Sequence, residues 1–112
     1  SALLRLFYPS RGNFIAVVGP WNQGRWVKRV KARMKGATGL PVYSIRAPAF
    51  VPGIDFSDHH AYWPYGFNAL MVTDTGFYRN MAYHTQYDDM EKLDYERMSD
   101  VVVAVFEAIR DI

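Results

Sequence analysis

The first half of the chain contains a strand, a helix and a second strand in close succession, and this order limits the possible folds more than any other feature. Residues 13–19 form an apolar, β-branched run closed by a Gly-Pro pair, which is typical of a buried strand. Residues 21–35 follow with helical periodicity, because large apolar side chains recur at every fourth position: Trp26, Val30 and Met34. Residues 41–47 predict a second strand. A strand, a helix and a strand within about 35 residues indicate a parallel pair joined by a crossover, and therefore an α/β fold.

The second half of the chain predicts two more helices and one more strand. Proline and glycine make residues 48–55 a loop, after which Ser57 is a candidate N-cap for a short helix that Pro64 and Gly66 would end. Residues 69–73 predict a third strand. A long C-terminal helix is expected from the N-cap Asp94 onward, with apolar side chains at helical spacing: Met98, Val101, Val102, Val105, Phe106 and Ile109.

Composition limits the classes of protein to consider. A chain of 112 residues with 50% hydrophobic and 16% aromatic content is one globular domain at most. No apolar run is long enough for a membrane span, and the absence of cysteine excludes a disulfide framework. The net charge of +2 hides an asymmetry, because all 11 acidic residues lie at or after Asp55. The basic helix lacks a recognisable nucleic-acid-binding motif, so we expect neither a nucleic-acid nor a membrane partner.

The side chains best suited to chemistry are concentrated in residues 57–85. All three histidines of the chain lie here: His59, His60 and His84. Imidazole is a common zinc ligand, and it also changes its protonation near neutral pH. Any chemistry of this chain is therefore expected in this segment.

Several short motifs carry a family resemblance. In order along the chain they are Ser57-Asp58-His59, Trp63, residues 66–75 and Tyr83-His84-Thr85, with residues 12–19 upstream and residues 91–98 downstream. This order resembles the C-terminal part of the M28 family of zinc aminopeptidases, which is related to the glutaminyl cyclases. The resemblance implies that residues 1–112 are a single partial domain. It also implies part of a three-layer zinc-peptidase-like sheet with flanking helices, with about three strands, one crossover helix and a long C-terminal helix.

The resemblance assigns roles to particular residues. It implies that His84 is a zinc ligand and that Asp58 is a catalytic residue beside the metal, in its hydrogen-bond network. It further implies that His59, Phe77, Tyr78 and Tyr83 line a substrate pocket. Simpler alternatives exist: His84 as a loop histidine with no ligand, Asp58 as an acid that suits the first turn of a helix for electrostatic reasons, and the aromatic side chains as core, which is common at this density.

The chain lacks most of what the family's site requires. Zinc needs three or four donors, whereas the family's other metal ligands and its paired-glutamate base have no counterparts before Ser57. A small zinc site built only from the local carboxylates and imidazoles is disfavoured, because adjacent side chains on a helix point in different directions. We therefore expect zinc in the complete enzyme, but not on this chain alone.

Two classes of function follow. In the first, the chain is the C-terminal part of a zinc aminopeptidase that removes N-terminal residues from peptide substrates, inactive alone and completed by the remainder of the domain. In the second, it is a non-catalytic α/β module for assembly or binding, with a partner or a homo-oligomer covering the open sheet edge. Cyclase chemistry differs from the first class only in the reaction. The family resemblance favours an extracytoplasmic location.

Overall fold

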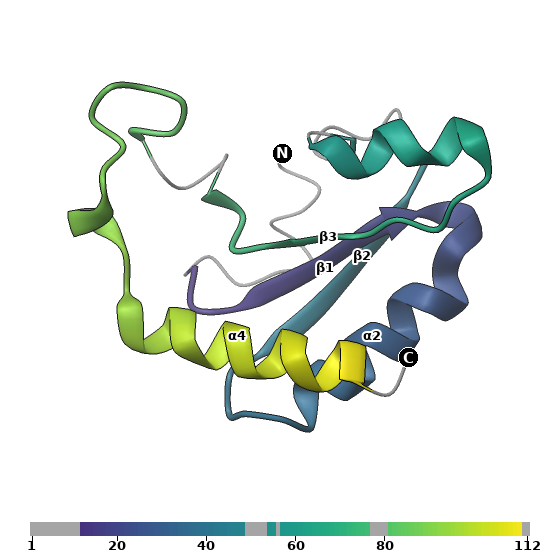
Figure 1. Ribbon diagram of the computed structural model, residues 1–112, viewed down its shortest axis with the longest axis horizontal. Coiled ribbons are helices and arrows are strands. Elements are labelled where there is room, and N and C mark those ends of the chain that lie inside the picture. The colour runs from purple at the N-terminus through teal and green to yellow at the C-terminus, as the bar shows by residue number, and fades with distance from the viewer. Residues whose placement is uncertain (1–11, 49–53, 56, 77–80, 111–112) are drawn as a thin grey trace.

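The computed structural model describes residues 12–48, 54–55, 57–76 and 81–110. Strands and helices alternate along this part of the chain (Figure 1), so the predicted α/β fold is confirmed. In order, the elements are β1 (Ile15–Pro20), the 3-10 helix η1 (Trp21–Gln23), α2 (Gly24–Lys35), β2 (Val42–Ala47), the 3-10 helix η2 (Asp58–Tyr65), β3 (Met71–Thr73), the 3-10 helix η3 (Met90–Lys92) and α4 (Tyr95–Arg110).

The three strands form one mixed sheet in the order β2-β1-β3. β1 and β2 are parallel, with Ile15 beside Val42, which confirms the predicted strand, crossover helix and strand. β3 runs antiparallel to β1 and places Thr73 beside Ala16. The C-terminal end of β3 therefore lies where β1 and β2 begin.

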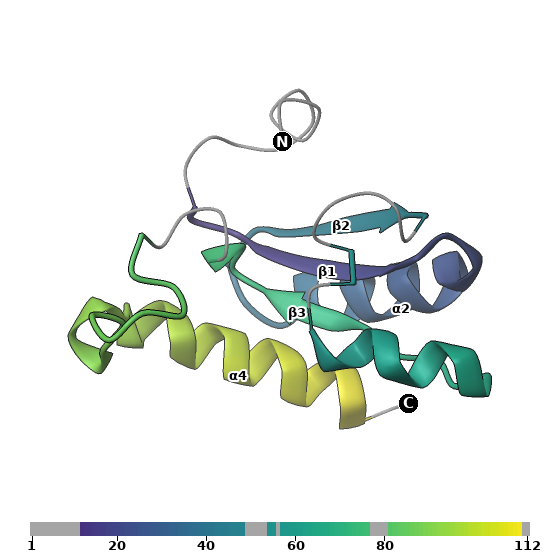
Figure 2. The same cartoon turned by 90° about the horizontal axis from the view of Figure 1, so that it is seen from above.

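One face of the sheet is covered by α2 and α4, which lie side by side in both views (Figures 1 and 2). Alternate side chains of β1 point to this face, where Ile15 and Val17 pack with Val27, Val30 and Met34 of α2. Gly19 lets the layers approach closely, because a Cβ atom there would lie 2.6 Å from Val27 Cγ2. The helix predicted over residues 21–35 is confirmed.

The opposite face of β1 is buried by a second apolar cluster. Phe14, Ala16 and Val18 pack there with Ile54, and Trp63 of η2 lies against the cluster. Helices, sheet and η2 thus form three layers around a central strand that is buried on both faces. This is why residues 13–19 are apolar without alternation.

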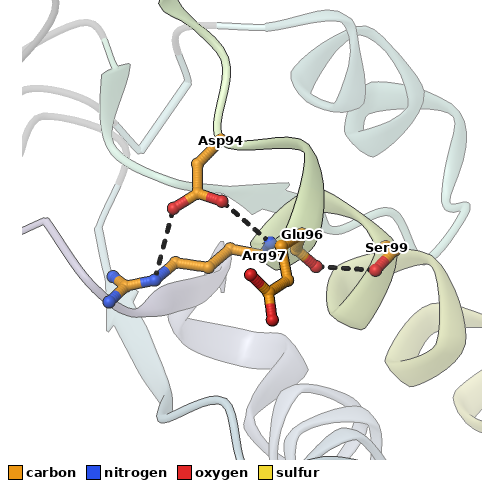
Figure 3. A network of polar contacts seen from close by, with 4 residues as sticks. All are labelled: Asp94, Glu96, Arg97 and Ser99. Carbon is orange, nitrogen blue, oxygen red and sulfur yellow. Dashed lines mark hydrogen bonds and ion pairs between the residues drawn. The ribbon is translucent and has the colours of Figure 1, made fainter.

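The predicted N-cap of α4 is confirmed. The Asp94 carboxylate accepts a hydrogen bond from the backbone N–H of Arg97 at 3.1 Å, and it also lies 3.4 Å from the Arg97 Nε (Figure 3). Within the first turn, Ser99 Oγ donates to the Glu96 carbonyl at 2.6 Å. None of the helices in the described part of the chain is both long and apolar enough to cross a membrane.

The predicted limits of the short helix and of the third strand differ from the structure. η2 continues through Pro64 and ends at Gly66, whose φ of 81° is left-handed, and the Ser57 side chain makes no capping hydrogen bond. Pro64 does not end the helix because it removes only its own donor, while the Gly66 N–H still reaches the Trp63 carbonyl at 3.1 Å. β3 begins at Met71 rather than at residue 69, since the Ala69 N–H is bonded to the side chain of Gln23.

Candidate functional site

His59 points into the protein from the first turn of η2. Only 7% of the residue is exposed, its Nε2 lies 2.5 Å from the Ile54 carbonyl oxygen, and its ring meets Trp63 edge to face at 5.1 Å. A carbonyl oxygen only accepts, so Nε2 carries a proton and donates it to this bond. Nδ1 is buried and has no hydrogen-bond partner in the described structure. His59 therefore fastens residue 54 to η2, and its contacts are those of a core residue.

The neighbours of His59 point outward. Asp58 and His60 are both exposed, and His60 Nδ1 lies 2.7 Å from the Ser57 carbonyl. Asp58 is the acidic residue in the first turn of η2, which is where a carboxylate favours the helix electrostatically. Consecutive residues of this segment thus face different sides, as expected for a helix.

His84 is exposed and lies in a tight turn between β3 and α4. Its backbone φ of 59° is left-handed, a conformation that few non-glycine residues adopt, and its ring stacks on Tyr83 with centroids 4.0 Å apart. The turn is closed by the Thr85 N–H, which donates to the Ala82 carbonyl at 2.9 Å. The turn therefore presents the imidazole to the outside with Tyr83 behind it.

The structure does not bring Asp58 and His84 together. η2 lies near the end of β1, because Gln23 follows β1 and hydrogen-bonds to Phe67 O and Ala69 N just beyond η2. β3 then carries the chain back along β1, so residues 81–93 lie at the opposite end of the long axis from η2 in both views (Figures 1 and 2). Phe77 and Tyr78 are outside the described residues, so of the predicted pocket only His59 and Tyr83 can be placed, and they too lie at opposite ends.

A cavity of about 410 Å³ lies between the start of β1, the end of β3 and the start of α4. Its polar lining includes Asp74, Asp94 and Arg97, and apolar side chains such as Val72 and Val101 form much of the remainder. Of these, Val72 and Asp74 lie in the segment of residues 57–85 that contains the three histidines. The cavity is a cleft at the edge of the sheet, where the described layers leave space.

His84 is an exposed imidazole, and imidazole is a common zinc ligand. Among the described residues, no group of three or more His, Cys, Asp or Glu side chains is arranged to hold a metal ion. Zinc needs three or four donors, so the donor set of this part of the chain does not by itself fit zinc. A site that includes His84 requires donors from elsewhere.

Gln23 was not identified as important from the sequence. Its side chain positions residues 67–69, which lead into β3. Its amide accepts from the Ala69 N–H at 3.1 Å and donates to the Phe67 carbonyl at 3.4 Å, although it is buried and these partners are 46 and 44 residues away. A glutamine in the short 3-10 helix η1 gives no local signal of such distant partners.

Comparison with known proteins gives a relative but no family. The chain is 49% identical over 98 residues to the uncharacterized protein YfbL of Escherichia coli (strain K12). The matched region is 88% of this chain but only 30% of that relative, so the chain spans less than a third of the relative's length. No protein-family model matches the chain, and no solved structure matches it.

Proposed function

We propose that this chain is part of a zinc-dependent aminopeptidase, to which it contributes His84 as one metal ligand. The substrate class is peptides with a free N-terminus. In this proposal the remaining zinc donors and the general base come from the rest of a longer polypeptide. When bound, zinc would supply an activated water and polarise the peptide carbonyl.

The observation that carries the proposal is the conformation of His84. A non-glycine residue held in the left-handed region is strained by about 1–3 kcal/mol, and such residues concentrate at functional sites. The imidazole at this strained position is exposed, and it stacks on the Tyr83 ring. A pre-oriented imidazole is what a metal site needs from a ligand on a loop.

Two further observations support the proposal. The motifs around His84 follow the order of the M28 family, and the α/β architecture with a long C-terminal helix agrees with that family's expected fold. The relative is about three times as long as the match, which leaves room for the other donors. The proposal rests on His84 rather than on Asp58, since η2 and the His84 turn lie at opposite ends of the described structure.

The test compares the complete product of the gene with two single variants. We expect the complete protein to bind zinc, measured by elemental mass spectrometry, and to cleave an aminoacyl p-nitroanilide. His84→Ala should lower kcat/KM by at least about 100-fold. Even the loss of a residue that only hydrogen-bonds to a metal ligand lowers metal affinity or activity by about 10–100-fold. His60→Ala is the matched control: it is another exposed histidine of the motif segment, and the activity should be retained.

Asp58→Asn in the same assay tests the catalytic role of Asp58 separately. A large loss of kcat with normal zinc content would support that role, whereas unchanged kinetics would leave Asp58 as a helix N-terminal acid. A complete protein without stoichiometric zinc and without peptidase activity would refute the proposal. That result would favour the non-catalytic α/β module.

A further inference from the structure

α4 has two apolar faces, and the described residues of the chain cover one of them. The inner face contacts α2 and the sheet through Ala104 and Ala108, with Val101 and Val105 packed beside them. A second set of apolar side chains follows a separate line along the helix at spacings of three and four residues and is exposed: Tyr95, Met98, Val102, Phe106 and Ile109. We call this second set the outer stripe.

The outer stripe is unusual for the surface of a small protein. Val102, Phe106 and Ile109 are 64%, 56% and 61% exposed. A surface helix normally needs an apolar arc only about 100° wide, but the inner face and the outer stripe of α4 together cover roughly half of its circumference. Contiguous exposed apolar surface of this kind marks an interaction site.

The outer stripe lies beside an open edge of the sheet. β3 pairs with β1 on one side and with no strand on the other among the described residues. Val72 of β3 is partly exposed although it lies level with Val17, on the face that the helices cover. The cavity between β3 and α4 continues this surface through Val72 and Met98. Edge, cavity and stripe therefore form one incompletely covered region.

We propose that the outer stripe of α4 and the free edge of β3 are the docking surface for the remainder of a longer polypeptide that contains this chain. The relative argues for this occupant, because more than two thirds of it lies outside the matched region. Additional strands beside β3 would lie in the layer that α4 already covers, so they would bury the outer stripe and satisfy the free strand edge together. Both proposals assume a longer polypeptide, but the docking surface requires no peptidase chemistry, so a failure of the zinc and activity tests would not contradict it.

Hydroxyl-radical footprinting with mass spectrometry tests the proposal on the 112-residue chain and on the complete gene product. In the short chain as a monomer, Met98 and Phe106 should be oxidised readily. In the complete product, as a monomer, their oxidation should slow several-fold, because a buried side chain is shielded from the solvent that carries the radical. Phe67 is the matched control, because it is 62% exposed, follows η2 and belongs to neither the outer stripe nor β3, so it should keep its reactivity.

Two results would overturn the proposal. One is rapid oxidation of Phe106 in the complete monomeric protein. The other is protection of Phe106 in the short chain with a dimeric mass by light scattering, which would show that a second copy covers the stripe.

A pair of variants gives an independent measurement in the complete product. Phe106→Asp should lower Tm by about 5 °C or more, whereas Phe67→Asp should change it by less than about 2 °C. In the short chain Phe106→Asp should leave Tm nearly unchanged, because the side chain already faces solvent. Equal shifts for the two variants in the complete product would contradict a surface specific to α4.

Discussion

His59 donates a hydrogen bond from Nε2 to the carbonyl oxygen of Ile54 at 2.5 Å, and this bond joins the segment before η2 to the helix. Ile54 belongs to the apolar cluster on one face of the sheet, and Trp63 packs both on that cluster and on the His59 ring. The histidine therefore holds together the layer that covers this face. Because Nε2 is used by the backbone, His59 has only Nδ1 left, and that atom is buried.

Substitution of His59 should destabilise the protein far more than substitution of its neighbour. His59→Ala removes a buried ring and leaves the Ile54 carbonyl without its donor, which should cost about 2–4 kcal/mol in the free energy of unfolding. His60→Ala removes an exposed ring and should cost less than about 0.5 kcal/mol. Urea denaturation followed by tryptophan fluorescence measures both. Equal effects would contradict the anchoring role of His59.

Local patterns predict the helices and strands of this fold well. The apolar run of β1, the four-residue spacing of α2 and the cap at Asp94 are each contained in a short segment, and each is confirmed. The direction of β3 cannot be predicted from a short segment, because it depends on where the chain lies after η2. The sequence places Asp74 at the end of a strand, but only the structure shows that this end lies where the parallel strands begin.

The burial of α4 shows a second limit of sequence patterns. Met98, Val102, Phe106 and Ile109 have the spacing of a core face, yet the residues that are fully buried in the helix are Ala104 and Ala108. Small side chains let α4 approach α2 and the sheet closely, so the alanines rather than the large residues mark the inner face. Hydrophobic periodicity identifies a helix, but it does not distinguish an internal contact from a surface meant for another segment.

The candidate site was predictable as a set of residues but not as an arrangement. His84 is identified by its motif, while its left-handed backbone and its stacking on Tyr83 emerge only in three dimensions. The distance along the molecule between η2 and the His84 turn follows from the antiparallel course of β3, which no local pattern encodes. That further donors complete a metal site around His84 remains a prediction for the complete protein.

The side chain of Gln23 should be essential for the conformation of residues 67–69, which lead into β3. Gln23→Ala removes the acceptor of the Ala69 N–H and the donor to the Phe67 carbonyl, so we expect a loss of about 1–3 kcal/mol of stability. Gln23→Glu keeps the acceptor for Ala69 but brings a second acceptor toward Phe67 O, and it should also destabilise. Hydrogen exchange of the Ala69 amide should accelerate in the alanine variant. Unchanged exchange would show that this amide is protected by something other than Gln23.

Gly66 and Gly39 should respond differently to the same substitution. Neither would meet another atom within 4 Å if a Cβ were added, so steric contact does not distinguish them. Gly66 has a φ of 81°, where an L side chain is disfavoured by about 1–2 kcal/mol, whereas the φ of Gly39 is outside that region. Gly66→Ala should therefore destabilise the protein by about that amount in urea. Gly39→Ala should be neutral or stabilising by up to about 1 kcal/mol, since it restricts the unfolded chain.

Asp94 makes two interactions at the start of α4, and two substitutions separate them. Asp94→Ala removes both the N-cap to the Arg97 N–H and the ion pair with Arg97, and should cost about 1 kcal/mol. Asp94→Asn keeps a capping oxygen but loses the charge, so it should cost less than about 0.5 kcal/mol, because both side chains of the pair are more than half exposed and water screens them. The measurement is urea denaturation at low and high salt. If the asparagine variant were as unstable as the alanine variant, the ion pair rather than the cap would be what holds the first turn of α4.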